Sequence, residues 1–110
     1  MLKGVLSLLL LQLCATREDY GYALVVRLQH LGFDDLAEGT VYPALTRLES
    51  QGLLESHLVR SSSGPARKYY GPTPSGRAEL ARARADWCAL VQAVEGAVSA
   101  ETVDVSEVQS

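Results

Sequence analysis

Residues 38–54 read EGTVYPALTRLESQGLL, and this stretch decides the fold. On a helical wheel of about 100° per residue its apolar side chains gather on one side. They are Val41, Ala44, Leu45 and Leu48. The opposite side carries Pro43, Thr46, Arg47 and Ser50. Gly52 follows the last periodic residue, where a glycine commonly ends a helix. The stretch therefore predicts a short helix with one face in a core and the other face open to a partner.

The open face has the chemistry of a nucleic-acid contact. Thr, Tyr and Arg side chains near the start of a short helix suit the phosphate oxygens and base edges of a DNA major groove. Arg47 is the candidate for reading a guanine directly, because arginine pairs with that base through two hydrogen bonds. The candidate DNA contacts on this helix are Thr40, Tyr42, Pro43, Thr46, Arg47 and Ser50.

A hairpin is predicted directly after the helix. Residues 54–60 and 67–71 have strand-like content, and the segment SSSGPA between them is made of residues that break regular structure. Cations flank this small polar tip, as expected of a loop that lies along a DNA backbone. A hairpin that is merely soluble is the alternative. The candidate contacts are Arg60, Ser62, Ser63, Arg67 and Lys68.

The second strand of the hairpin carries two adjacent tyrosines. Tyr69 and Tyr70 point to opposite faces of a strand, so one is expected to pack inward and the other to lie near solvent or DNA. Gly71 and Pro72 follow them and predict that this strand is short and ends early.

Two segments together resemble a known family. EGTVYPALTRLESQGLLES, followed by GPARKYYGPTPSGRAEL, is similar to the short subfamily of the PadR winged helix-turn-helix transcriptional regulators. The likeness spans residues 2–94, and its motifs are GT-Y-AL-RLE-GL, RKYY and T-GR. The resemblance implies a dimer that binds DNA, represses transcription by occluding promoters and is released by a small molecule.

Residues 1–15, MLKGVLSLLLLQLCA, are apolar on nearly every side and predict a helix covered all round. We expect its own domain to cover one part of this helix and a second subunit to cover the rest, with Leu9 at the interface. The apolar run is too short to span a membrane, which takes about 20 residues. The alternative is a secretory or lipoprotein signal ending near Cys14, but Leu13 stands where a small residue would precede cleavage.

A second helix is predicted between Asp19, a candidate N-cap, and Gly32. Its periodic apolar residues are Leu24, Val25, Leu28 and Leu31. Tyr20 or Tyr22 is expected either to reach a phosphate or to pack in the core, and we include Tyr22 among the DNA contacts. A polar turn leads to the third helix, where Ala37 replaces the small hydroxyl residue usual in the family. That replacement weakens the N-cap, so Thr40 or the Gly39 backbone is expected to compensate.

A long C-terminal helix begins at Thr73-Pro74, with threonine as N-cap and proline at the first helical position. Its apolar stripe is too long for one small domain to cover, which predicts a homodimer. The residues assigned to an effector pocket or dimer interface are Leu9, Trp87, Leu90, Val91 and Val94. Two interpretations of Trp87 stay open: in multidrug-binding relatives a matching tryptophan stacks on a flat ligand, and large aromatics also fill ordinary interface cores. Gly96 predicts fraying, and the acidic residues 99–110 are expected to be mobile.

Composition fits one domain that binds DNA through one face. The 110 residues are 47% hydrophobic with a formal net charge of -3. Residues 40–84 nevertheless carry seven cations against three anions, whereas residues 85–110 carry five anions and no cation. Cys14 and Cys88 have no ligand-spaced partners and are interpreted as small core residues. The sequence pattern indicates no catalytic set, metal site or cofactor.

The predicted fold is α+β and mostly helical. It comprises a winged helix-turn-helix domain at residues 1–72, a dimerisation helix at 73–98 and a disordered tail at 99–110. The predicted function is a cytoplasmic, bacterial, dimeric transcriptional repressor without enzymatic activity that binds a palindromic operator in double-stranded DNA and a small aromatic effector, with no membrane partner. The alternative is a winged-helix module for protein-protein interaction that binds no DNA.

Overall fold

The computed structural model describes the backbone of residues 2–109 and the side-chain surroundings of residues 4–100. The chain divides into two compact units, Met1–Leu80 and Ala81–Ser110. The boundary falls inside the last helix, so the first unit contains three helices, a small sheet and the beginning of a fourth helix.

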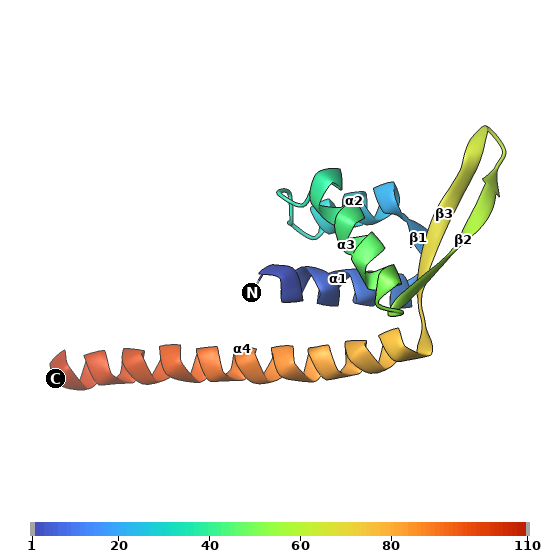
Figure 1. Ribbon diagram of the computed structural model, residues 1–110. Coiled ribbons are helices and arrows are strands. Elements are labelled where there is room, and N and C mark those ends of the chain that lie inside the picture. Colours follow the sequence, from blue (N-terminus) through green and yellow to red (C-terminus); the bar gives the residue numbers. More distant parts are fainter. Residues whose placement is uncertain (1, 110) are drawn as a thin grey trace. The chain divides into compact units, whose positions relative to one another are not determined.

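The helices of the first unit are α1 (Leu2–Thr16), α2 (Gly21–His30) and α3 (Glu38–Ser50), which lie together beside the sheet (Figure 1). The predicted core face of α3 is confirmed, because Val41, Ala44, Leu45 and Leu48 are all buried. They pack in one cluster with Leu10 and Leu11 of α1 and Leu24 and Leu28 of α2. The prediction that Leu31 continues the apolar stripe of α2 is wrong: this residue lies after the helix and is 59% exposed.

Helix α1 is covered unevenly. Leu6, Leu10, Leu11 and Cys14 are buried, while Leu8, Leu9 and Leu13 are only partly buried against the same core. Burial raises the pKa of the Cys14 thiol to about 12, so this side chain stays protonated as a small core residue. Cys88 is exposed in the single chain, which contradicts the core prediction for it, because it lies on a helix that no other element of its unit covers. Within the described residues, no helix has the length and apolar content to cross a membrane.

The sheet has three antiparallel strands in the order β1-β3-β2. Strands β2 (Leu54–Ser61) and β3 (Gly64–Pro72) form the predicted wing, a long ribbon that extends away from the helices (Figure 1). The third strand, β1 (Asp19–Tyr20), was not predicted, and it pairs with Tyr70 and Tyr69 of β3. The prediction that β3 ends early is also wrong, because its pairing with β2 continues until Pro72 faces Leu54.

The two adjacent tyrosines of β3 do alternate as predicted. Tyr70 is buried at 7% exposure, and Tyr69 is half-buried with its ring 5.5 Å from the ring of Tyr20. Tyr70 and Tyr69 therefore lie on opposite faces of the sheet, and the face that carries Tyr70 is turned toward the core.

Asp19 is not the N-cap of α2, which corrects the sequence prediction. Tyr20 occupies that position without a side-chain cap. The Asp19 carboxylate is buried and pairs with the Arg27 guanidinium at 3.3 Å. Arg27 also donates to the carbonyls of Leu13 and Arg17, at 3.1 and 3.2 Å. The pair thus fastens α2 to the end of α1.

The two helix boundaries at the base of the wing are confirmed. Gly52 ends α3 with a φ of 75°, a left-handed conformation that glycine adopts without strain, and the Leu53 amide donates to the Leu48 carbonyl at 2.9 Å. At the start of α4 (Pro74–Gln109), the Thr73 hydroxyl accepts from the Gly76 amide at 2.9 Å. Thr73 is therefore the N-cap.

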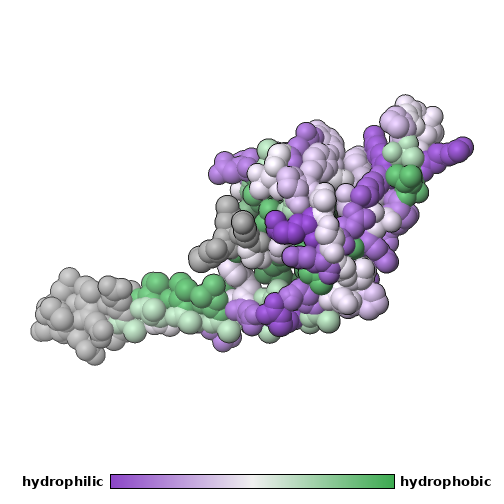
Figure 2. Space-filling model, in the orientation of Figure 1, coloured by the Kyte–Doolittle hydropathy of each residue, from purple (hydrophilic) through white to green (hydrophobic). Residues whose placement is uncertain are grey.

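The second unit is the remainder of α4. The helix continues through Gly96 and residues 99–109, and both the fraying at Gly96 and the mobility of the tail stay predictions. Apolar side chains gather along its described surface (Figure 2). The large ones that are exposed are Trp87, Leu90, Val94 and Val98.

Candidate nucleic-acid interface

The outer face of α3 presents the predicted contacts together. Thr40, Tyr42, Pro43, Thr46 and Ser50 are exposed, and Arg47 is half-buried. Within the described part of the chain, the Arg47 side chain makes no hydrogen bond or ion pair, so its guanidinium is available for an external acceptor. Helix α3 starts after Ala37 with no side-chain cap, and the backbone amide of Thr40 in its first turn donates to the Ala37 carbonyl at 3.0 Å.

A recess lined with tyrosines lies between the start of α2, α3 and β3. Its volume is about 220 Å³. The lining residues are Tyr20, Gly21, Tyr22, Tyr42, Arg67, Lys68 and Tyr70. The recess therefore combines phenol groups with two cations, a combination that suits an anionic oxygen such as that of a phosphate.

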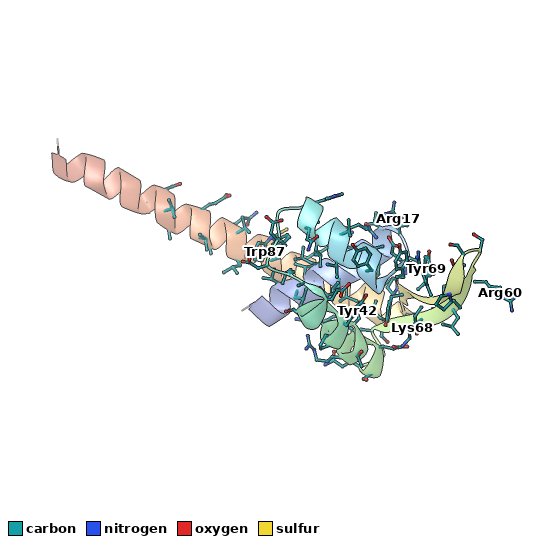
Figure 3. The ribbon with its side chains drawn as sticks, turned by 90° about the horizontal axis from the view of Figure 1, so that it is seen from above. Arg17, Tyr42, Arg60, Lys68, Tyr69 and Trp87 are labelled. Atoms are coloured by element: carbon teal, nitrogen blue, oxygen red, sulfur yellow. The ribbon has the colours of Figure 1, made fainter. Side chains whose placement is uncertain are left out.

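Tyr42 forms the α3 side of this recess (Figure 3). Burial, and then the nearby Glu38 carboxylate, raise the pKa of its phenol, so the hydroxyl stays protonated and can donate a hydrogen bond. The ring packs directly over Gly21, where a Cβ atom would overlap it. Tyr42 is therefore the side chain that requires a glycine at this position.

The three wing cations have different surroundings. Arg60 projects from the outer part of the wing (Figure 3), and no partner for its side chain occurs among the described residues. The Arg67 guanidinium lies 4.3 Å from the centre of the Tyr20 ring, a cation-π contact. The Lys68 ammonium is 2.9 Å from a Glu49 carboxylate oxygen. Ser62 and Ser63 are exposed at the tip.

Glu49 is a residue that the sequence prediction missed. Its second oxygen accepts a hydrogen bond from the Ser56 hydroxyl at 2.5 Å. The hydrogen bond from Ser56, and then the one from Lys68, lower the pKa of the Glu49 carboxyl. The hydrogen bond between Glu49 and Lys68 also raises the pKa of the Lys68 ammonium. The only sequence signal is spacing, because Tyr42, Thr46 and Glu49 follow at i, i+4 and i+7 on one edge of α3.

The residues assigned to an effector site fall into different units. Leu9 belongs to the first unit, where it lines a cavity of about 330 Å³ with other residues of α1 and of the turn between α2 and α3. Trp87, Leu90, Val91 and Val94 belong to the second unit, where Val91 is half-buried and the other three are 42%, 44% and 52% exposed in that order. No group of three or more His, Cys, Asp or Glu side chains that could hold a metal ion occurs in the described residues.

Three helices, a helix-turn-helix formed by α2 and α3, and an antiparallel wing define a winged helix-turn-helix protein. Residues 10–82 match the transcriptional regulator PadR-like family, and the chain belongs to that family. A transcriptional regulator of Mycobacterium tuberculosis is 39% identical over 82 residues, which cover 74% of this chain and 75% of that one.

Solved structures agree with this assignment. A PadR-like transcriptional regulator from Bacillus cereus has a TM-score of 0.82 and 38% identity, covering 89% of this chain and 95% of that chain. Bacillus subtilis PadR, whose structure was determined in complex with operator DNA, has a TM-score of 0.65 and 28% identity. That likeness covers 76% of this chain and 45% of the Bacillus subtilis protein.

Proposed function

We propose that this transcriptional regulator is a homodimeric repressor that binds a palindromic operator through α3 and the wing. The observation that carries the proposal is the shared recess, in which Tyr42 of α3 lies with Arg67 and Lys68 of the wing. A helix and a hairpin that converge on one anion-binding recess fit a groove and the adjoining phosphate backbone. Bacillus subtilis PadR was solved in complex with operator DNA, which supports operator DNA as the partner.

Within this proposal the contacts divide into two kinds. Arg47 reads a base, with Thr40, Thr46 and Ser50 beside it on the outer face of α3. Tyr22, Tyr42, Arg60 and Arg67 contact phosphates, and Lys68 lines the same recess as Tyr42 and Arg67. The protein acts on DNA in the cytoplasm of a bacterium, and it carries out no enzymatic reaction.

The exposed apolar side chains of α4 support the homodimer. Monomeric proteins rarely leave a long apolar stripe in water, and a second copy of the helix would cover it. Release by a small aromatic effector is the regulatory part of the proposal. Both interpretations of Trp87 are compatible with the homodimer, because its ring would be covered there either in a ligand pocket or in the core of the interface.

Selection of bound sequences from random double-stranded DNA with the purified protein tests the proposal. We expect an enriched palindromic consensus whose half-sites are about one helical turn apart. A failure to enrich any sequence, with no binding to bulk DNA at low salt, would instead favour the protein-protein interaction module.

A further inference from the structure

Glu49 joins the recognition helix to both strands of the wing. One carboxylate oxygen accepts from the Lys68 ammonium of β3 at 2.9 Å, and the other accepts from the Ser56 hydroxyl of β2 at 2.5 Å. Ser56 and Lys68 lie on the side of the wing that faces α3, because Ser56 pairs with the buried Tyr70 and strand side chains alternate. Both oxygens of Glu49 are therefore engaged within the protein.

This contact distinguishes Lys68 from the other wing cations. No carboxylate pairs with Arg60 or Arg67 among the described residues, whereas the charge of Lys68 is balanced by Glu49. The side chains of Lys68 and Glu49 are 49% and 31% exposed, so the pair lies at the surface where DNA can approach.

The pair also borders the recess to which we assign a phosphate. Lys68 lines the recess, and Glu49 lies on the same edge of α3 as Tyr42. A phosphate that enters the recess would meet a lysine already bound to an anionic oxygen. Carboxylate and phosphate oxygens are equivalent partners for an ammonium group, so the two anions compete for it.

We propose that Glu49 competes with the DNA backbone for Lys68. Because the Glu49 carboxylate is bound to the Lys68 ammonium, the protein has a lower affinity for DNA of any sequence. The proposal rests on the function proposed above. It identifies a positioning residue: Glu49 holds a lysine away from phosphate and reads no base.

The test compares Glu49→Gln with the wild-type protein on operator and random duplexes over a range of salt concentrations. A glutamine amide can keep both hydrogen bonds, accepting from Lys68 and donating to Ser56, but it removes the charge that balances the lysine. We expect affinity for both duplexes to rise about three- to tenfold at low salt, and the salt dependence to steepen by about 0.9 in slope for one added phosphate contact.

Glu55→Gln is the matched control, since Glu55 is exposed on the wing and the same charge is removed without a lysine partner. Lys68→Met, alone and combined with Glu49→Gln, completes the design. We expect Lys68→Met to change the slope by much less than one unit in the wild-type background and by about 0.9 in the Glu49→Gln background.

Three results would overturn the proposal. Glu49→Gln could leave affinity unchanged or reduce it, it could strengthen binding equally in the absence of Lys68, or Lys68→Met alone could lower the slope by a full unit. The salt slope of Lys68→Met is measured with Glu49 unchanged, so it tests the proposal even if the Glu49→Gln protein folds poorly. A wild-type protein that binds no DNA would contradict the proposed function itself.

Discussion

The ring of Tyr42 lies directly over Gly21, so that any side chain at position 21 must displace it. Tyr42 belongs to α3 and Gly21 to the first turn of α2, and the contact forms part of the wall of the tyrosine recess. The glycine thus connects the packing of two helices with the shape of the proposed phosphate site.

We predict that Gly21→Ala weakens DNA binding while changing the free energy of unfolding little. A Cβ atom at position 21 would meet only ring atoms at the end of a side chain that is 41% exposed, so the ring can move toward solvent at small cost. The displaced ring no longer completes the recess, so we expect operator affinity to fall about fivefold, as for one lost contact. Fluorescence anisotropy with labelled operator and urea unfolding give the two quantities. Tyr42→Phe, which keeps the ring in place, is the control for the hydroxyl. Undiminished affinity in Gly21→Ala would mean that the position of the ring does not matter.

Arg47→Ala is expected to weaken operator binding by about 1 to 3 kcal/mol and to leave binding to random DNA nearly unchanged. The reason is that the guanidinium lies on the outer face of α3 with no partner among the described residues. Parallel titrations of operator and random duplex make the measurement. An equal loss on both duplexes would identify Arg47 as a phosphate contact.

Breaking the ion pair between Asp19 of β1 and Arg27 of α2 should destabilise the first unit. Asp19→Ala leaves the Arg27 guanidinium, 18% exposed, with carbonyl acceptors but no counter-charge, so we expect a loss of about 3 kcal/mol in the free energy of unfolding. Arg17→Ala is the matched control. Arg17 also reaches Asp19, at 3.5 Å, but its side chain is 68% exposed, and its removal should cost less than about 0.5 kcal/mol. Similar losses in the two variants, measured by urea unfolding, would contradict this ranking.

Local rules predicted the presence of the helices and the two boundaries at Gly52 and Thr73, because these features depend on neighbouring residues. The spacing of Val41, Leu45 and Leu48 decides which face of α3 is buried, and Gly52 and Thr73 act within one turn of their positions. The wing and its cations were also visible as strand-like segments around a turn.

Contacts between distant residues could not be predicted in this way. Strand β1 has only two residues and exists because β3 offers an unpaired edge at Tyr69 and Tyr70. Glu49 and Lys68 are 19 positions apart, and their pairing is not visible before their elements are placed in space. For the same reason Asp19 appeared to be a cap, although its partner Arg27 lies two turns into the next helix.

The uncapped start of α3 offers a gain in stability. Ala37→Ser places a hydroxyl where it can accept from a free amide of the first turn, and we expect the free energy of unfolding to rise by about 0.5 to 1 kcal/mol. Ala93→Ser is the control, because the same exchange at an exposed position inside α4 should lower helix stability by about 0.5 kcal/mol. Thermal unfolding of both variants decides the matter, and a destabilised Ala37→Ser protein would show that the hydroxyl finds no amide.

The exposed stripe of α4 leads to a prediction about assembly. Leu90, Val94 and Val98 follow one another at intervals of four residues, so they share one face of the helix, and they are 44%, 52% and 60% exposed in the single chain. Leu90→Asp puts a carboxylate on that face. If two copies bury it against each other, the unpaired charge should weaken dimerisation by about 3 kcal/mol or more, because a buried charge needs a partner. Sedimentation velocity over a range of concentrations would then show monomer for Leu90→Asp and dimer for the wild type.

Gln92→Asp introduces the same carboxylate at an exposed position on another side of the helix and should leave the dimer intact. Operator affinity should fall together with dimerisation, since two half-sites bound by one dimer are lost to separate monomers. A Leu90→Asp protein that sediments as a dimer would show that the stripe is not the interface.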